Sequence, residues 1–135
     1  MILGNWDVDV FCGHDRNYFV DRNITLDCRG SINIHPETIF GFNIQIYTQS
    51  HDKKDFSKVV SRPVIIEKGC FIGSGSILFN CTIGEGSIVS VGSVVASIDI
   101  PPFSMVDGNP AKVVAYLKNG QWKNISRRCK CLNSQ

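Results

Sequence analysis

The stretch from Ile83 to Val94 reads IGEGSIVSVGSV, and the six residues from Ile72 read IGSGSI. Each six-residue unit begins with an aliphatic residue, has glycine or another small residue near its second and fourth places, and has serine at its fifth. A period of six fits neither a heptad nor the two-residue alternation of a half-buried strand. It fits a chain that wraps around a prism, with one inward aliphatic side chain on each side.

Further units extend this pattern upstream. They begin at Ile66 (IEKGCF), Ile46 (IYTQSH), Phe40 (FGFNIQ) and Ile34 (IHPETI), and more loosely at Leu26 (LDCRGS) and Val20 (VDRNIT). Glycine and serine suit the tight corners, where a side chain would clash or φ must be positive. Because one coil cannot bury its own apolar face, several coils must stack. The sequence therefore predicts an all-β solenoid.

Two interruptions break the period. Ile72 and Ile83, which each begin a unit, are 11 residues apart rather than the twelve that two full units would span. The unit ILFNCT from Ile77 is therefore expected to follow a side that is one residue short. Residues 52–62, DKKDFSKVVSR, are charged and carry no period, so we expect a loop extruded from the coils. A long loop in an otherwise regular solenoid is often functional.

The C-terminal part is expected to end the stack. Pro101 and Pro102 cannot continue a hydrogen-bonded ladder. Ala111 to Lys118 is predicted to be a short helix, with Pro110 near its first turn and Gly120 near its end. This helix and a tail, together residues 110–135, would cap the open strand edge. We expect residues 1–135 to form a single domain.

Composition narrows the function classes. The net charge of +2 is too small to indicate a nucleic-acid or membrane partner. The start lacks a basic segment followed by a long apolar one, and no apolar run is long enough to span a bilayer, so a cytoplasmic location is expected. None of the six cysteines forms a Cys-x-x-Cys pair, so no zinc site is expected. Cys70 and Cys81 are predicted to be small buried hydrophobes.

Four ordered segments carry a resemblance to a known family. They are IHPETIFGFNIQIYTQSHD, RPVIIEKGCFIGSGSI, TIGEGSIVSVGSVV and IPPFSMVDGNPAKVV, between about Ile32 and Val114. They resemble the hexapeptide-repeat acyltransferases, and in particular the small sugar O-acetyltransferases. The resemblance implies a left-handed parallel β-helix, a homotrimer with active sites between subunits, and acetyl-CoA as the donor for a small sugar or glycan acceptor, with no metal.

The resemblance also assigns the chemistry. His51, in TQSHD, occupies the place of the family's catalytic histidine, which ends the repeat before the extruded loop. A sugar hydroxyl is barely ionised at neutral pH, so a base must take its proton as oxygen attacks the thioester, and histidine suits this role. Asp52 could orient the imidazole, although a carboxylate or carbonyl from elsewhere is an equal candidate. We expect His35 and His14 to be surface residues.

The donor and acceptor sites are assigned in the same way. Residues whose backbone is expected to contact the pantetheine arm of acetyl-CoA are Ser74, Gly75, Val91 and Gly92, with Lys112 as a cation for its phosphates. Family members commonly read GSVVTKDIP, whereas this chain has Ala96 and Ser97 in place of the threonine and lysine that help hold the cofactor. Acceptor contacts are expected from Asp15, Asn17 and Asp21.

Three other functions stay open. Transfer to the amine of a nucleotide-linked amino sugar would use the same base. A γ-type carbonic anhydrase needs three converging metal-binding histidines, and His14, His35 and His51 do not reproduce its spacing. A non-catalytic β-helix used for assembly would explain the missing threonine and lysine.

Overall fold

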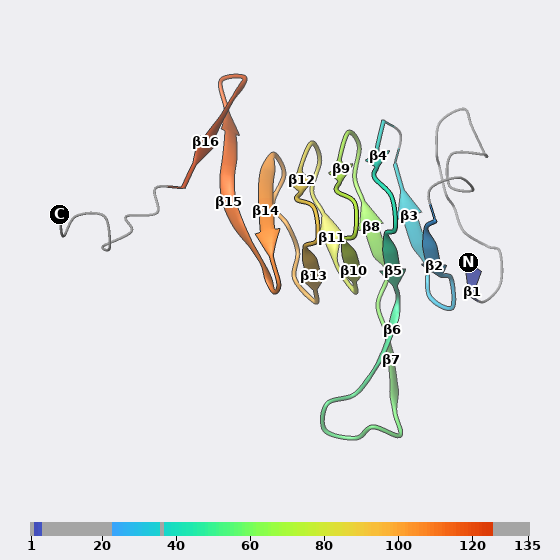
Figure 1. The fold of residues 1–135 in the computed structure, drawn as a ribbon. Coiled ribbons are helices and arrows are strands. Elements are labelled where there is room, and N and C mark those ends of the chain that lie inside the picture. Colours follow the sequence, from blue (N-terminus) through green and yellow to red (C-terminus); the bar gives the residue numbers. More distant parts are fainter. Residues whose placement is uncertain (1, 4–22, 36, 126–135) are drawn as a thin grey trace.

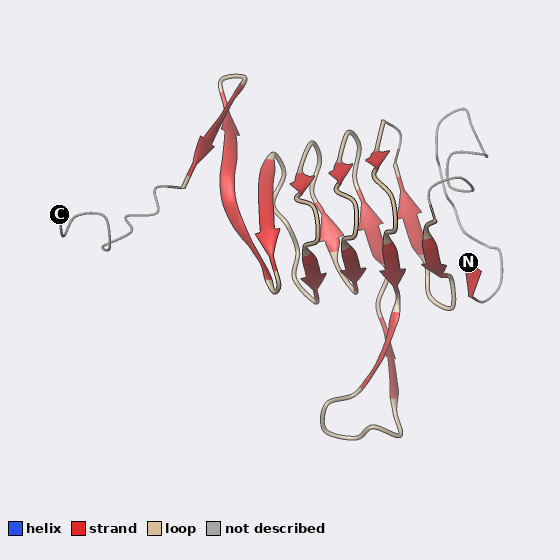
Figure 2. Cartoon of the chain, in the orientation of Figure 1, coloured by secondary structure: helices blue, strands red, loops and turns tan. Residues whose placement is uncertain are grey.

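The computed structural model describes residues 2–3, 23–35 and 37–125. These residues form strands, turns and loops but no helix, as Figure 2 shows, and accordingly none that is long and apolar enough to cross a membrane. Most strands belong to three sheets. Sheet A contains, in spatial order, β1 (Ile2–Leu3), β2 (Thr25–Asp27), β5 (Gln45–Tyr47), β10 (Ile77–Phe79) and β13 (Val94–Ala96).

The other sheets complete the coils. Sheet B contains β11 (Thr82–Ile83), β8 (Val64–Ile66) and β3 (Ile32–Ile34). Sheet C contains β16 (Gln121–Asn124), β15 (Ala111–Lys118), β14 (Ser104–Gly108), β12 (Ile88–Val89), β9 (Phe71–Ile72) and β4 (Ile39–Phe40). The chain passes from sheet B to C to A in each turn, and equivalent strands of successive turns pair in parallel. Figure 1 shows these turns stacked along one axis.

The inward side chains form the core that the six-residue period predicts. In sheet C, Phe40, Ile72, Val89 and Val106 are in register, and each is fully buried. Equivalent buried columns are Ile34, Ile66 and Ile83 in sheet B, and Leu26, Ile46, Leu78 and Val95 in sheet A. Fully burying an aliphatic side chain stabilises a fold by roughly 1.5–3 kcal/mol, so these columns hold the coils together. Cys70 and Cys81 are buried, as predicted.

The predicted phase is wrong by one residue after Ile72. Leu78, six residues later, points inward, whereas Ile77 is half-buried. The shortened side therefore runs from Leu78 to Ile83. Asn80 makes this turn with a φ of 47°, a conformation that asparagine tolerates better than most residues. Leu26 confirms the loose N-terminal unit, while Val20 lies outside the described residues.

The predicted C-terminal helix is wrong. Ala111–Lys118 is strand β15, which pairs antiparallel with β14 and then with β16. Asn119 and Gly120 have φ values of 52° and 72°, as the two central residues of a type I′ hairpin turn require. Asn-Gly after a run rich in valine and tyrosine is a hairpin signal, and the helical interpretation overlooked it. The open edge of sheet C is thus extended by a hairpin rather than capped by a helix.

The extruded segment is a two-stranded arm. Strands β6 (Gln49–His51) and β7 (Val59–Ser61) pair antiparallel, with His51 opposite Val59. In Figure 1 the arm projects away from the coils. The excursion therefore begins at Gln49 rather than at Asp52, and His51 lies within the arm rather than before it.

Candidate active site

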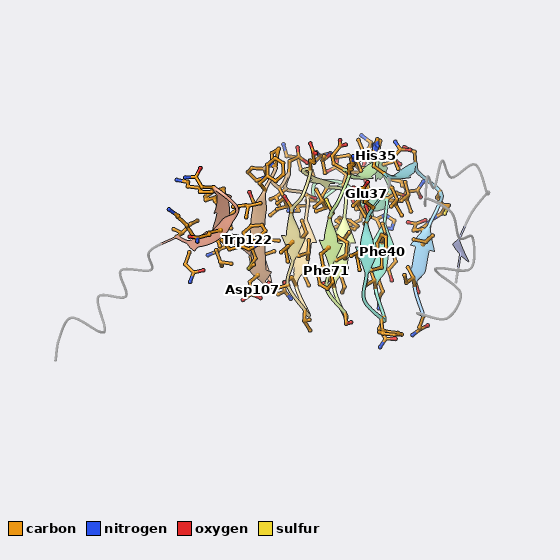
Figure 3. The ribbon with its side chains drawn as sticks, turned by 90° about the horizontal axis from the view of Figure 1, so that it is seen from above. His35, Glu37, Phe40, Phe71, Asp107 and Trp122 are labelled. Atoms are coloured by element: carbon orange, nitrogen blue, oxygen red, sulfur yellow. The ribbon has the colours of Figure 1, made fainter. Side chains whose placement is uncertain are left out.

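Each coil has three corners, which we name by the sheets they join: BC, CA and AB. Figure 3 looks onto sheet C, where Phe40 and Phe71 lie on neighbouring strands between His35 and Glu37 at corner BC and Asp107 on the side of corner CA. The arm leaves the coils at corner AB, between β5 and β8. The predicted site residues divide between corners CA and AB.

Corner CA brings together the four residues predicted to contact the donor. The Gly75 N–H donates to the Phe42 carbonyl at 2.8 Å, and the Gly92 N–H donates to the Ser74 carbonyl at 2.9 Å. Gly75 and Gly92 have φ values of 74° and 69°, in the left-handed region that glycine enters without strain. Ser74–Gly75 and Val91–Gly92 therefore stack directly, one coil above the other.

The outer edge of corner CA is small and partly apolar. A Cβ atom at Gly73 would lie 2.6 Å from the Val91 nitrogen, so neighbouring coils can approach only because this side chain is missing. The Ser74 hydroxyl accepts a hydrogen bond from the Phe42 N–H at 2.9 Å, which turns it towards backbone. Phe42 and Val91 on either side of it are 54% and 72% exposed. A thin chain with apolar and amide groups would fit against such an edge.

The predicted cation lies at the end of this corner. Lys112 is exposed and lies opposite Asp107 in the antiparallel register of β14 and β15, where the chain turns from one strand to the other, one coil beyond Val91. Ala96 and Ser97, which replace the family's threonine and lysine, lie instead at corner AB. There the Ser97 N–H donates to the Phe79 carbonyl at 2.8 Å.

His51 is exposed on the arm and held in one orientation. Its Nδ1 lies 2.7 Å from the Phe56 carbonyl oxygen. A carbonyl oxygen only accepts hydrogen bonds, so Nδ1 carries the proton in neutral imidazole. The proton-free nitrogen of this tautomer is Nε2, which can accept a proton from a substrate. This hydrogen bond orients the ring and leaves Nε2 able to accept a proton.

The orienting partner is not Asp52. The Asp52 Oδ1 accepts from the Lys54 N–H at 2.7 Å, so this carboxylate stabilises the turn of the arm. The backbone carbonyl of Phe56 takes the orienting role instead. Sequence reasoning left a carbonyl from elsewhere open but could not name it, because any residue can supply a backbone carbonyl.

The other groups of chemical interest are two buried cysteine thiols and the side chains of corner BC. Burial raises the pKa of Cys70 to about 11 and that of Cys81 to about 12, so both stay protonated and unreactive at neutral pH. At corner BC, His35 Nε2 lies 3.6 Å from Glu67 Oε2 and both side chains are exposed. Among residues 2–3, 23–35 and 37–125, no three His, Cys, Asp or Glu side chains gather into a metal-binding cluster.

The structure does not bring all predicted residues together in one chain. Corner CA precedes and corner AB follows each strand of sheet A, so the length of these strands separates His51 from Gly75 and Gly92. His14 and the predicted acceptor contacts, Asp15, Asn17 and Asp21, lie outside the described residues.

Comparisons with known proteins give the chain its relatives. No family model matches it. A protein of Schizosaccharomyces pombe named as an acetyltransferase is 34% identical over 110 residues, covering 77% of this chain and 52% of that protein. A Staphylococcus aureus protein, also named as an acetyltransferase, is 35% identical over 111 residues, covering 77% of this chain and 54% of its own length. The chain thus spans about half the length of these relatives.

Solved structures with a similar fold are also acetyltransferases. A hexapeptide-repeat acetyltransferase of Vibrio cholerae matches with a TM-score of 0.66 and 32% identity over 72% of this chain and 57% of that one, and it has also been solved with acetyl-CoA. A maltose O-acetyltransferase of Clostridium difficile matches with a TM-score of 0.64 and 30% identity over 71% of this chain and 54% of that one. By sequence and by fold, the chain is similar to hexapeptide-repeat acetyltransferases over about half of their length.

Proposed function

We propose that this chain is an acetyl-CoA-dependent O-acetyltransferase that acts on a hydroxyl of a sugar or glycan precursor, with His51 as the general base. The observation that supports the proposal is the 2.7 Å contact between His51 Nδ1 and the Phe56 carbonyl, which leaves Nε2 as the nitrogen able to accept a proton. The named activities of the relatives support the reaction class.

The proposed reaction needs no covalent enzyme intermediate. Nε2 takes the proton of the acceptor hydroxyl while its oxygen attacks the thioester carbonyl, forming a tetrahedral intermediate. The C–S bond then breaks, and the CoA sulfur leaves with the proton that imidazolium returns. A well-placed general base contributes roughly 10²–10⁴-fold in rate.

Corner CA is the proposed donor site. The pantetheine arm would lie along Ser74, Gly75, Val91 and Gly92, with the exposed Phe42 and Val91 side chains against its apolar parts. Lys112 would meet a CoA phosphate, because a cation at the end of the corner offers charge-assisted hydrogen bonds. Acceptor contacts from Asp15, Asn17 and Asp21 remain part of the proposal.

The proposed assembly is a homotrimer with active sites between subunits. In one chain the proposed base and the proposed donor site lie at opposite ends of the sheet A strands. Rotation about a three-fold axis beside sheet A would bring the arm of one copy to corner CA of the next, so each of three sites would be complete. We also propose that the coils wind left-handed, as in the family, against the usual right-handed crossover; a crystal structure would decide both points.

A thermal melt tests the donor site without knowledge of the acceptor. Acetyl-CoA should raise the melting temperature, since a ligand that binds only the folded state stabilises it. An unchanged melting temperature at millimolar acetyl-CoA would favour the non-catalytic assembly function. A panel of sugars, each paired with its amino analogue, would then identify the acceptor, and acetylation of only the amines would move the chain to the N-acetyltransferase class.

A further inference from the structure

A buried carboxylate lies beneath the base of the arm. Asp27 ends strand β2 at corner AB, in the coil before the arm, and it is fully buried. Its Oδ1 and Oδ2 receive hydrogen bonds from the Arg29 guanidinium at 2.6 and 2.9 Å. Burying a charge is costly unless the charge is paired and hydrogen-bonded, so a buried aspartate at a solenoid corner calls for a role.

The Arg29 N–H also donates to Asp27 Oδ1 at 3.3 Å, and further contacts of Asp27 go to the residue from which the arm departs. The Thr48 N–H donates to Asp27 Oδ2 at 3.3 Å, and the Thr48 hydroxyl donates to the Asp27 carbonyl at 2.8 Å. The same hydroxyl accepts from the Gly30 N–H at 2.8 Å. Thr48 is fully buried and is the last residue before β6. The departing end of the arm is therefore fixed to the Asp27–Gly30 turn by three hydrogen bonds.

The returning end of the arm is fixed to the same residue. The Arg62 N–H donates to the Thr48 carbonyl at 3.0 Å, and the Ser61 hydroxyl donates to it at 3.4 Å. A Cβ atom at Gly30 would lie 2.7 Å from the Ser61 oxygen and 2.8 Å from Thr48 Cβ, so the turn packs tightly against both ends.

A second anchor lies on the other side of the arm. The Arg62 guanidinium contacts Asp99 Oδ1 at 2.5 Å, and this oxygen also accepts from the Thr82 N–H at 3.0 Å. The base of the arm is thus held between an earlier and a later coil, while its outer part, including Phe56, is exposed.

We propose that Asp27 and Thr48 are positioning residues, which fix the direction in which the arm leaves the coils and thereby the place of His51. This inference rests on the proposed function for its catalytic consequence but not for its structural one. Neither residue touches the reacting atoms. Because a displacement of about 1 Å in a reacting group can lower a rate by about 10²-fold, the anchor would control turnover from a distance.

The decisive variant is Thr48→Val, which removes the hydroxyl and keeps the shape of the side chain. Its matched control is Ser87→Ala at corner BC. The Ser87 hydroxyl is equally buried and also makes two hydrogen bonds between coils, donating to the Pro101 carbonyl at 2.8 Å and accepting from the Ser104 N–H at 3.2 Å. Thr48→Ser, which keeps the hydroxyl, is the conservative rescue, and Asp27→Asn is the second variant should Thr48→Val fail to fold.

Residual dipolar couplings of backbone amides provide the structural readout. In the wild type and in Ser87→Ala, amides of β6 and β7 should fit the same alignment frame as the coils. In Thr48→Val the couplings of the arm should shrink, and Thr48→Ser should restore them. If the arm keeps the frame of the coils in Thr48→Val and Asp27→Asn, the proposal is overturned.

Turnover provides the second readout. Thr48→Val should lower kcat by about 10–100-fold at unchanged KM for acetyl-CoA, because corner CA is intact, while Ser87→Ala retains kcat. Reduced couplings with wild-type kcat would overturn the link from the anchor to His51. If the wild type itself transfers no acetyl group to any acceptor, the proposed function fails, and the couplings alone decide whether Asp27 and Thr48 orient the arm.

Discussion

Corners CA and AB lie at the two ends of the same strands of sheet A, yet they are built differently. Corner CA repeats from coil to coil, with a residue of left-handed φ at the same place in successive coils: Asn43, Gly75 and Gly92. Corner AB differs in every coil: a turn held by Asp27, then the arm, then Asn80, then Ser97. A repeated corner can only offer a repeated surface, which suits a long ligand such as CoA. A corner that breaks the repeat can place one particular side chain, and here that side chain is His51.

The largest expected effect concerns the irregular corner. His51→Ala should lower kcat by roughly 10²–10⁴-fold, because the proposed site then lacks its general base. Acetyl-CoA should still raise the melting temperature, since corner CA is untouched. Steady-state kinetics and a melt check both, with Lys53→Ala, an exposed neighbour on the arm, as control. Wild-type turnover in His51→Ala would show that His51 is not the general base.

A second effect tests what holds the irregular corner in place. Asp27→Ala leaves Arg29 and the Thr48 N–H without their acceptor, which should lower the free energy of unfolding by about 1–3 kcal/mol. Burial alone would raise the pKa of Asp27, but hydrogen bonds from Arg29 and Thr48 outweigh it and hold the pKa below 3.8. The ionised carboxylate therefore stabilises the fold above about pH 4, and this contribution is lost as the pH falls through the lowered pKa. Urea unfolding of wild type and variant at pH 7 and pH 3 should show the difference shrink in acid; an equal difference at both pH values would contradict this.

The regular corner offers a matched pair of glycines. Gly92 at corner CA and Gly69 at corner BC have φ values of 69° and 71°, and a Cβ atom at either would meet nothing within 4 Å. Asparagine tolerates this conformation, so Gly92→Asn and Gly69→Asn should change stability little and equally. Only Gly92→Asn should raise the KM for acetyl-CoA, by about tenfold or more, because filling a fitted contact costs roughly 1–3 kcal/mol. Equal KM values in the two variants would show that acetyl-CoA does not bind at corner CA.

The smallest expected effect concerns the buried thiol of Cys81 in the core. Burial raises the pKa of Cys81 from 9.0 to about 12, so the unfolded chain loses this proton first as the pH rises. The protonated thiol therefore favours the folded state fully below pH 9, and stability falls as the pH rises from 9 towards 12. Between pH 8 and pH 10 the wild type should lose about 1 kcal/mol more than Cys81→Ala in urea unfolding. Parallel losses would show that this thiol does not titrate as its burial implies.

The same comparison explains what could be predicted from the sequence. The period of six identified the inward residues and the glycine corners because it reflects a geometry that repeats in each coil. The 11-residue spacing from Ile72 to Ile83 revealed that one side is short, but the period placed Ile77 inward instead of Leu78, because the position of the short side is visible only once the strands are paired. The helix expected at Ala111–Lys118 failed because pairing with β14 decided the conformation, while Asn119–Gly120 fixed a hairpin.

The candidate site divides along the same line. Ser74, Gly75, Val91 and Gly92 were predicted as a set, and the structure gathers them at one corner. The orienting carbonyl of Phe56 and the anchor at Asp27 could not be predicted, because they depend on contacts between segments with no shared pattern. LDCRGS looked like a weak repeat unit, and it is weak because Asp27 and Arg29 serve the arm rather than the period.

Mixing two inactive variants tests the central claim most directly, namely that the arm of one copy serves corner CA of the next. His51→Ala lacks the base and Gly92→Asn obstructs the donor corner, so at low acetyl-CoA each alone should have at most about a tenth of wild-type activity. In trimers reassembled from equal amounts, about a quarter of the sites would pair an intact arm with an intact corner. The account predicts that the mixture recovers about that fraction of wild-type turnover. A mixture that stays as inactive as its components, with subunit exchange verified by mass, would contradict it.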